Sequence, residues 1–349
     1  MTMLRYFGIY ALAAVGLGSL FAHGAWTFAL PIVAFGLIPA LELFAPGTVA
    51  NLSPEEEQRR LADRRYDWLL FGIAPLMLAS IVLLVARVSV GARSGVDLVG
   101  AVVTVGLLCG ALGINVAHEL GHRAEALHRG LSRALLGMTL YAHFFVEHNR
   151  GHHLRVATAE DPASSRRGEW LYAFYVRSIV SGARSAFGIE GERLRRQGRT
   201  AWSLRNEVLL GWIIQAGAVG AVALVSVPAA AAWVSAALLG ILTLETINYV
   251  EHYGLARSVR ADGRPEPVRP RHSWNANHSV GRALLFDLTR HSDHHANPRR
   301  PYPVLRHFDE APQLPTGYPG MMVLAAVPPL FFAVMHRRLD ALDAAPIAA

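Results

Sequence analysis

Nine of the sixteen histidines in this 349-residue chain occur in four short groups. One group, LTRHSDHHANP, has histidines at positions i, i+3 and i+4, which share one face of a helix and could hold one metal centre. HELGH and EHNRGHH have similar spacings, and NYVEHYGL adds one histidine. A lone histidine is usually an ordinary core or surface residue, but four such groups in one chain predict metal binding. The candidate ligands are His118, His122, His148, His152, His153, His252, His291, His294 and His295.

The donor type limits the metal. Cys109 is the only cysteine, which excludes cysteine-ligated zinc and iron–sulfur sites built within the chain. Imidazole suits zinc, copper, iron and nickel. Nine histidines can fill the shells of two ions, and two irons with four or five nitrogens each, and room for oxygen, fit the count.

Other polar and aromatic residues lie near these groups. The polar ones are expected to support ligand imidazoles by hydrogen bonding or to be ordinary surface groups. They are Glu119, Glu147, Glu251, Asp293, His272 and His278. Three aromatic residues are candidates either for lining the site or for plain packing: Tyr249, Trp274 and Phe286.

The composition indicates a membrane protein. Hydrophobic residues make up 52% of the chain, charged residues only 17%, and the mean hydropathy is +0.29, which is unusual for a soluble chain of this length. Six apolar runs are long enough to cross a bilayer, and the first is interpreted as a retained helix rather than a signal peptide. They lie at 4–22, 25–45, 68–87, 96–117, 207–227 and 229–249. The predicted fold is an all-α integral membrane protein with six transmembrane helices and a cytoplasmic histidine-rich di-iron domain.

The arginines predict the orientation. All 33 cationic residues are arginine, and they concentrate in the loop after the second span, between residues 123 and 205, and after the sixth span. Because cytoplasmic loops carry the excess of positive charge, both termini and every histidine group are expected on the cytoplasmic side of the cell inner (plasma) membrane.

Four regions follow from this topology. Residues 1–117 form spans one to four, and residues 118–206 form a cytoplasmic region with the first two histidine groups and a re-entrant or membrane-lying helix at 131–146. Residues 207–249 form spans five and six. Residues 250–349 form a cytoplasmic region with the remaining histidines and an interfacial or packed helix at 320–334.

HELGH, EHNRGHH, NYVEHYGL and LTRHSDHHANP, in this order, resemble the four histidine motifs of membrane alkane 1-monooxygenases, within the integral-membrane desaturase and hydroxylase superfamily. The resemblance runs from His118 to Tyr318 and includes EDPASSRRGE, HSWNANH and LPTGYPG. It implies a non-haem di-iron centre, held by the nine histidines, that uses dioxygen and two electrons to convert a terminal methyl into a primary alcohol. Thr289 stands where the family more often has glutamine, and the first hundred residues, where the family sets chain length, match in layout only.

Electrons are expected from outside the chain, because it has no GxGxxG fingerprint after a strand, no CxxCH motif and no cysteine set for a rubredoxin. The resemblance implies rubredoxin or a ferredoxin, reduced by a flavoprotein with NADH or NADPH. A small acidic donor is expected to dock on basic residues at Arg195 and Arg196. Membrane lipid and a hydrophobic small-molecule substrate are the other expected partners, and no nucleic acid is expected.

Two alternatives remain open. The first is a related hydroxylase or desaturase acting on aryl-methyl, terpene or fatty-acyl substrates, since pocket shape decides the substrate. The second is a metal transporter or a haem-binding membrane protein. A transporter should place its ligands in mid-membrane on broken helices, and a bis-histidine haem needs only two ligands, so the positions and number of these histidines favour an oxygenase.

Overall fold

The computed structural model describes residues 3–45 and 47–344, and the regular elements in this part of the chain are all helices, apart from two isolated bridges. Five of the helical segments are long and apolar enough to cross a membrane: Gly24–Phe44, Arg65–Ser89, Gly95–Gly121, Glu207–Val225 and Val227–His252. The first predicted span is a shorter apolar helix, Met3–Ser19. The structure therefore supports a helical membrane protein, with five segments that meet the length needed for a span.

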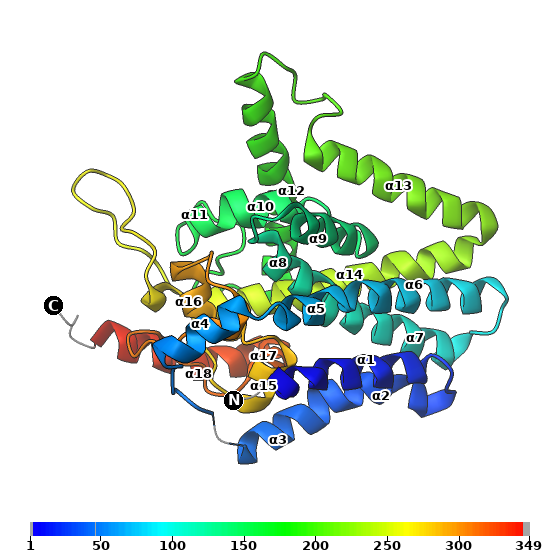
Figure 1. Ribbon diagram of the computed structural model, residues 1–349, viewed down its shortest axis with the longest axis horizontal. Helices are drawn as coiled ribbons and strands as arrows, with labels where there is room; N and C mark the ends of the chain where they lie inside the picture. Colours follow the sequence, from blue (N-terminus) through cyan, green and yellow to red (C-terminus); the bar gives the residue numbers. More distant parts are fainter. Residues whose placement is uncertain (1–2, 46, 345–349) are drawn as a thin grey trace.

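Several of these segments change helix type along their length. Met3–Ser19 consists of η1 (Met3–Phe7) and α1 (Gly8–Ser19). Gly24–Phe44 consists of η2 (Gly24–Phe28), α2 (Ala29–Ile32), η3 (Val33–Leu37) and α3 (Ile38–Phe44). Arg65–Ser89 comprises α5 (Arg65–Phe71) and α6 (Ile73–Ser89). Gly95–Gly121 comprises α7 (Gly95–Leu108), η4 (Cys109–Ile114) and α8 (Asn115–Gly121). Figure 1 shows them running roughly along the long axis of the molecule.

Capping residues set the last hairpin. Asn206 accepts hydrogen bonds from the backbone N–H groups of Val208 and Leu209 at the start of α13 (Glu207–Val225). Ser226 caps α14 (Val227–His252) in the same way, through the N–H of Ala229, and Pro228 occupies the first turn. Proline is favoured in the first turn of a helix. Ser226 is both the last cap of α13 and the first cap of α14, so this one residue ends one long helix and begins the next.

Close packing of α7 and η4 against α14 brings two histidine-bearing segments together. A Cβ at Gly240 would lie 2.5 Å from Cys109 Cβ, and a Cβ at Gly110 would lie 2.9 Å from the carbonyl oxygen of Gly240. Small residues allow such backbone approach in membrane helices. The approach matters for the site because α8, which continues η4, carries His118, and α14 ends at His252.

The region expected as one apolar helix at 131–146 is two helices. α9 (Ala126–Met138) ends before Leu140, which has a φ of 55°, and α10 (Phe144–Glu147) follows. Left-handed backbone is costly for a side chain such as leucine, so the chain turns here instead of continuing. The π-helix η5 (His148–His152) and the short α11 (His153–Arg155) then lead to the long helix α12 (Leu171–Arg195).

The C-terminal apolar segment is also divided. α17 (Tyr318–Ala325) and α18 (Pro328–Ala344) replace the single helix expected at 320–334. Proline disfavours helical backbone in the residue before it, which accounts for the break at Val327. α17 packs against α14, so it is a packed helix. The remaining short helices are α4 (Pro54–Ala62), η6 (Pro270–His272), α15 (Ser279–Leu284), α16 (His291–Ala296) and η7 (Tyr302–Val304).

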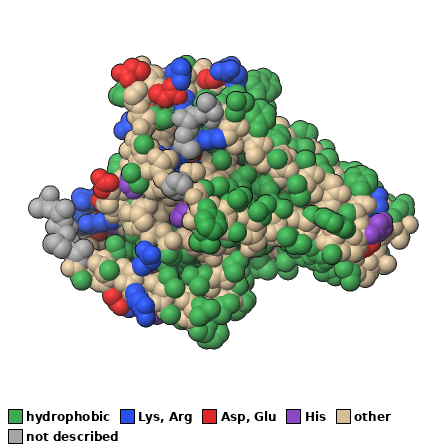
Figure 2. Space-filling view, turned by 90° about the horizontal axis from the view of Figure 1, so that it is seen from below, with side chains coloured by type: hydrophobic (Ala, Val, Ile, Leu, Met, Phe, Trp, Pro, Cys, Tyr) green, Lys and Arg blue, Asp and Glu red, His purple; other side chains and the backbone are tan. Residues whose placement is uncertain are grey.

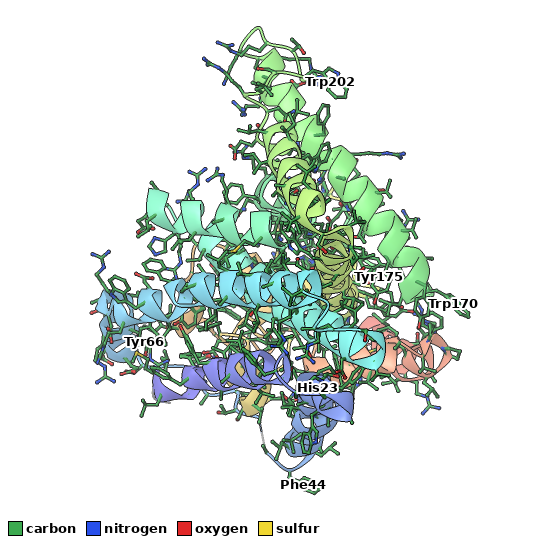
Figure 3. All side chains as sticks on the ribbon, turned by 90° about the vertical axis from the view of Figure 1, so that its right-hand side faces the viewer. His23, Phe44, Tyr66, Trp170, Tyr175 and Trp202 are labelled. Carbon is green, nitrogen blue, oxygen red and sulfur yellow. The ribbon has the colours of Figure 1, made fainter. Side chains whose placement is uncertain are left out.

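Polar and apolar side chains occupy different parts of the surface. Figure 2 shows hydrophobic side chains over most of one face, with charged side chains concentrated at one end and on the upper lobe. Figure 1 shows both termini at the end that carries α4, α11 and α16. Trp170 and Trp202 stand far apart beside the two ends of α12 in Figure 3, and both are largely exposed. Exposed tryptophans of this kind are typical of the membrane–water boundary.

Candidate metal centre

Five histidines form the first group. His118 lies on α8, with His122 at its C-terminal cap, His148 begins η5, His153 lies on α11 and His294 on α16; one nitrogen of each lies within 4.8 Å of all the others. Their Nε2 atoms face one another. The distance is 2.6 Å between His118 and His294, 3.1 Å between His122 and His148, and 2.9 Å between His148 and His153.

Four buried histidines form the second group: His152, His252, His291 and His295. Nε2 of His152 lies 3.2 Å from Nε2 of His295, and Nε2 of His252 lies 3.3 Å from Nε2 of His291. The two groups adjoin, because the rings of His153 and His295 stack with centroids 4.4 Å apart. The structure thus brings all nine candidate residues into two neighbouring sets of five and four donors.

The groups do not follow the sequence motifs. His291, His294 and His295 share one motif, but His294 belongs to the first group and the other two to the second. EHNRGHH is divided similarly, with His152 apart from its neighbours. His148–His152 is a π-helix, which pairs residues five apart along its axis, so His148 lies beside His153 and both belong to the first group, while His152 belongs to the second.

Burial keeps four of these imidazoles neutral. Burial, and next the neighbouring imidazoles, lower the pKa of His148, His153, His294 and His295 well below the ordinary value. Neutral histidines have a lone pair available for a metal. With metal–nitrogen bonds of about 2.1 Å, adjacent donors lie roughly 3 Å apart, which the observed Nε2 separations match. The donor set therefore fits two imidazole-ligated metal ions.

Asp161 is a functional candidate that the sequence pattern did not single out. Its Oδ2 lies 2.8 Å from Nδ1 of His152 and accepts a hydrogen bond from the hydroxyl of Ser164. A carboxylate on the far nitrogen of a ligand histidine fixes its tautomer. Asp161 lies in EDPASSRRGE, a stretch that belongs to the resemblance described above. It follows His152 by nine residues, a spacing that does not by itself predict a contact between the two side chains.

Three of the four carboxylates expected beside the ligands have other partners. Glu119 binds Arg123, Glu147 binds Arg155, and Asp293 binds Arg300, so these three hold arginines instead of fixing imidazole tautomers. Glu251 is different. Its Oε2 lies 3.1 Å from Nε2 of His291, on the side where a metal would bind. Its other oxygen accepts a hydrogen bond from the hydroxyl of Tyr318.

The remaining candidates serve packing and turns. Tyr249 donates a hydrogen bond to the carbonyl of Glu169, and Trp274 donates one to the carbonyl of Tyr253. The ring of Phe286 stacks on that of Tyr6. Nδ1 of His272 accepts from the backbone N–H of Arg269, and its Nε2 lies 3.3 Å from Glu266. His278 precedes α15, and its ring is hydrogen-bonded to no ligand histidine among the described residues.

Comparison with known proteins identifies the family. A sequence model of fatty acid desaturases matches residues 97–325. The alkane 1-monooxygenase of Acinetobacter baylyi is 41% identical over 310 residues, which cover 88% of this chain and 76% of that protein. This chain belongs to the alkane 1-monooxygenase family. The alkane 1-monooxygenase of Pseudomonas putida is 40% identical over 313 residues, covering 87% of this chain and 76% of that protein.

A more distant relative has a different named substrate. The hydroxylase component of the xylene/toluene monooxygenase of Pseudomonas putida is 28% identical over 350 residues, covering 97% of this chain and 89% of that protein. The resemblance expected from the four histidine motifs, and the enzyme class it implied, are therefore confirmed.

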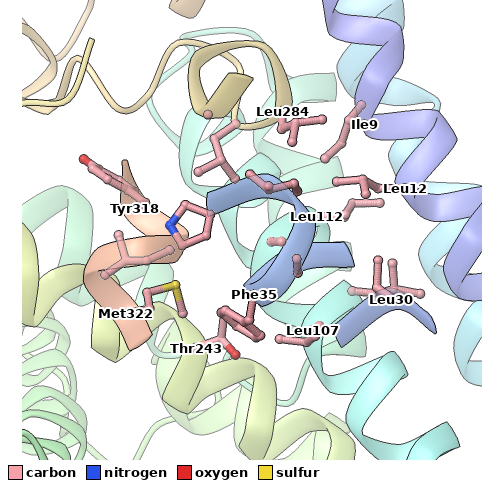
Figure 4. A pocket seen from close by; sticks show the side chains of 18 residues that line it. Ile9, Leu12, Leu30, Phe35, Leu107, Leu112, Thr243, Leu284, Tyr318 and Met322 are labelled. Carbon is pink, nitrogen blue, oxygen red and sulfur yellow. The ribbon is translucent and has the colours of Figure 1, made fainter. Parts of the chain in front are cut away.

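An apolar cavity of about 80 Å³ lies among the helices of this family member. Figure 4 shows Leu12 and Leu30 on one side of it and Tyr318 on the other, with the Tyr318 hydroxyl turned away. A smaller enclosed chamber of about 20 Å³ is lined by His118, His148 and His291, which come from both histidine groups. Three residues line both spaces: Ile247, Leu285 and Tyr318. The apolar cavity and the histidine chamber are thus separated by one layer of side chains.

Proposed function

We propose that this chain is a non-haem di-iron monooxygenase that hydroxylates the terminal methyl of alkanes. The five-histidine group holds one iron and the four-histidine group holds the other. Iron bound there supplies the activation of dioxygen. For each turnover one alkane, one dioxygen, two electrons and two protons give one primary alcohol and one water.

The observation that carries this proposal is the layer shared by the cavity and the chamber. An alkane has no polar group, so its binding depends on apolar burial, at about 0.8 kcal/mol for each methylene. The cavity offers a lining made almost entirely of aliphatic and aromatic side chains, and its wall at Ile247, Leu285 and Tyr318 adjoins histidines of both groups. A chain end that reaches this wall lies beside the metal ligands.

The residues around the chamber have separate roles. Ile247 and Leu285 exclude water and hold the chain end in place. The Tyr318 hydroxyl is held by Glu251, so it does not add a polar group to the cavity. Asp161 orients His152.

We further propose six spans, with the histidine groups on the cytoplasmic side of the cell inner membrane. Met3–Ser19 is apolar and packs along the second segment, and both termini lie at the histidine-bearing end, which supports an even number of crossings. Fourteen arginines lie between residues 123 and 205, and the region ends at the start of α13. Excess positive charge favours the cytoplasmic side.

The electrons are proposed to come from rubredoxin or a ferredoxin, reduced by a flavoprotein that oxidises NADH or NADPH. One-electron carriers of this kind are small and acidic, so a basic cytoplasmic surface attracts them. The expected contact at Arg195 and Arg196 lies near the outer end of α12, where both guanidinium groups share the exposed Glu192.

A second candidate substrate class is the aryl-methyl group. The relative named as a xylene/toluene monooxygenase component matches nearly the whole chain, and a methyl on a ring presents the same terminal C–H bonds as an alkane. Fatty-acyl and terpene substrates are weaker candidates, supported only by the breadth of the desaturase family.

The test uses purified protein in detergent or lipid. Metal content is measured by mass spectrometry, and octane and toluene are supplied separately with rubredoxin, its reductase and NADH. About two irons per chain with 1-octanol as product supports the proposal. Benzyl alcohol without octanol moves the function to the aryl-methyl class, and zinc or no metal in a folded sample rejects the oxygenase.

A further inference from the structure

The histidine site comes closest to the surface at two ligands. His122 and His153 are half-buried, the other seven ligands are buried, and the rings of these two have centroids 4.5 Å apart. The next residue, Leu154, is 72% exposed. An exposed leucine therefore follows directly after a ligand of the five-histidine group and stands two residues from His152, a ligand of the four-histidine group.

Leu154 lies at one side of a groove of about 890 Å³. The opposite side is the outer half of α12. Figure 1 shows α11 and this half of α12 on the side of the molecule away from the hairpin turns. The groove is lined by Arg150, Leu154, Arg155, Ser185, Gly188, Ile189, Glu192, Arg193, Arg196 and Gln197. Its lining thus combines apolar contact area with four arginines.

Buried carboxylates hold three of these arginines in place, and the fourth, Arg196, pairs with the exposed Glu192 of the same lining. Glu190 is fully buried and binds Arg150 and Arg193, whose side chains are 32% and 36% exposed. The side chain of Glu147, which is only 9% exposed, forms an ion pair with Arg155. Because the carboxylates lie underneath, the groove presents guanidinium groups outward. Arg184, one turn before Gly188 on α12, is exposed and has no carboxylate partner among the described residues, so it adds positive charge on this helix.

A projecting loop adjoins the groove at Leu154. In residues 255–269, the backbone N–H of Arg257 donates to the carbonyl of Ala157 and its Nη2 donates to the carbonyl of Leu154, both at 2.8 Å. Figure 1 shows this loop extending away from the helices at the histidine-bearing end. Its base therefore lies against Leu154, and its arginines at 257, 260 and 264 extend the basic surface.

We propose that the surface centred on Leu154, between the outer half of α12 and the base of loop 255–269, is the docking site of a small acidic one-electron carrier. This inference rests on the proposed function. Transient electron-transfer complexes use small interfaces, in which charge steers the encounter and an apolar centre makes the contact. The carrier is oxidised as it donates one electron through the His153 region, and two reduced carriers are consumed for each dioxygen.

The test is direct binding of oxidised rubredoxin to iron-loaded protein in detergent, measured by biolayer interferometry at low and high salt. Leu154→Glu should weaken binding at least about tenfold at low salt, because it adds a repelling charge at the centre of the contact. The matched control is Leu61→Glu on α4, where the leucine is 56% exposed and does not line the groove. This control should bind rubredoxin like the wild type.

Arg184→Glu provides a second variant, at an exposed position of α12 next to the groove residue Ser185. It should weaken rubredoxin binding at low salt and much less at high salt, since dissolved ions screen the repulsion between the introduced carboxylate and the acidic carrier. Only proteins with wild-type iron content are compared, so if Leu154→Glu loses iron, Arg184→Glu carries the test.

Two failures are distinguishable. If wild-type protein, reduced chemically and then given oxygen, forms no octanol, the proposed function is rejected. If it forms octanol but both Leu154→Glu and Arg184→Glu bind rubredoxin as tightly as Leu61→Glu, only the docking site is rejected.

Discussion

Asp161 and His152 form a buried pair in which Oδ2 of the carboxylate lies 2.8 Å from Nδ1 of the imidazole. Burial alone would raise the pKa of Asp161, but the charge and hydrogen bond of His152, together with the hydrogen bond from Ser164, hold this pKa below its ordinary value. Asp161 is therefore an anion that orients His152 with its Nε2 toward the other ligands of the four-histidine group.

Asp161→Asn should weaken metal binding selectively in the four-histidine group. An amide cannot act as a charged acceptor at Nδ1, and loss of such a partner lowers metal affinity by about 10- to 100-fold. We expect about one iron per chain after dialysis against a mild chelator, where the wild type keeps about two. Asp262→Asn, at an exposed loop position, should keep both. Two irons in Asp161→Asn would show that the pair has no effect on binding.

Gly240→Val should destabilise the protein by separating α14 from η4. A Cβ at this position would lie 2.5 Å from Cys109 Cβ and 3.0 Å from the backbone nitrogen of Gly110, and overpacking of this kind costs about 1–3 kcal/mol. The midpoint of thermal unfolding in detergent should fall, and iron content should fall with it, because His118 and His252 lie on the separated segments.

The control is Gly217→Val, because no atom lies within 4 Å of a Cβ at that position on α13. It should unfold at nearly the wild-type temperature. Equal melting of the two variants would mean that the α14 contact is not limiting for stability.

That the nine histidines gather at one site was predictable, because their residue type and local spacing are typical of metal ligands. Their division into groups of five and four was not. It depends on the π-helix at His148–His152 and on the direction from which α16 approaches, and neither is encoded in the spacing. Asp161 was missed for the same reason, since its contact with His152 arises from a loop that returns to the site.

Helix lengths show a similar limit. The apolar runs predicted the positions of most long apolar helices within a few residues. The turn at Leu140 was not visible in the composition of 131–146, which contains no proline. The break at Val327 was easier to predict from the sequence, because the Pro328–Pro329 pair that causes it is visible there.

Glu190 makes stability depend on acid pH. Burial would raise its pKa, but hydrogen bonds from Arg193 and the backbone N–H of Glu207, and the charge of Arg150, lower it to about 2. The folded-state pKa is thus below the ordinary value, so the stabilisation is complete above about pH 4.5 and is lost as the pH falls toward 2. The melting temperature of the wild type should fall through this window.

Glu190→Gln should lose this stabilisation at neutral pH. Hydrogen bonds to charged groups contribute about 1.5–3 kcal/mol, so its melting temperature at pH 7 should be lower and should vary less between pH 5 and pH 3. Glu192→Gln, two residues along the same helix and exposed, should behave like the wild type. Equal pH profiles for all three proteins would remove Glu190 as the source of acid sensitivity.

Leu12→Phe should shift the preference toward shorter alkanes. Leu12 lines the cavity on the side opposite Tyr318, so a larger ring there shortens the space available to a chain whose other end meets the histidine chamber. Each methylene that can no longer be buried costs about 0.8 kcal/mol, or about fourfold in kcat/KM. The measurement is competition among alkanes of six to twelve carbons, with the alcohols quantified by gas chromatography.

The control for this experiment is Leu4→Phe. Leu4 is 70% exposed on η1 and does not line the cavity, so the same substitution should leave the product distribution unchanged. If Leu12→Phe lowers all rates equally, the ring perturbs the fold and does not shorten the cavity. If it leaves the distribution of alcohols unaltered at full rate, the substrate does not extend to Leu12, and the cavity is not the site that measures chain length.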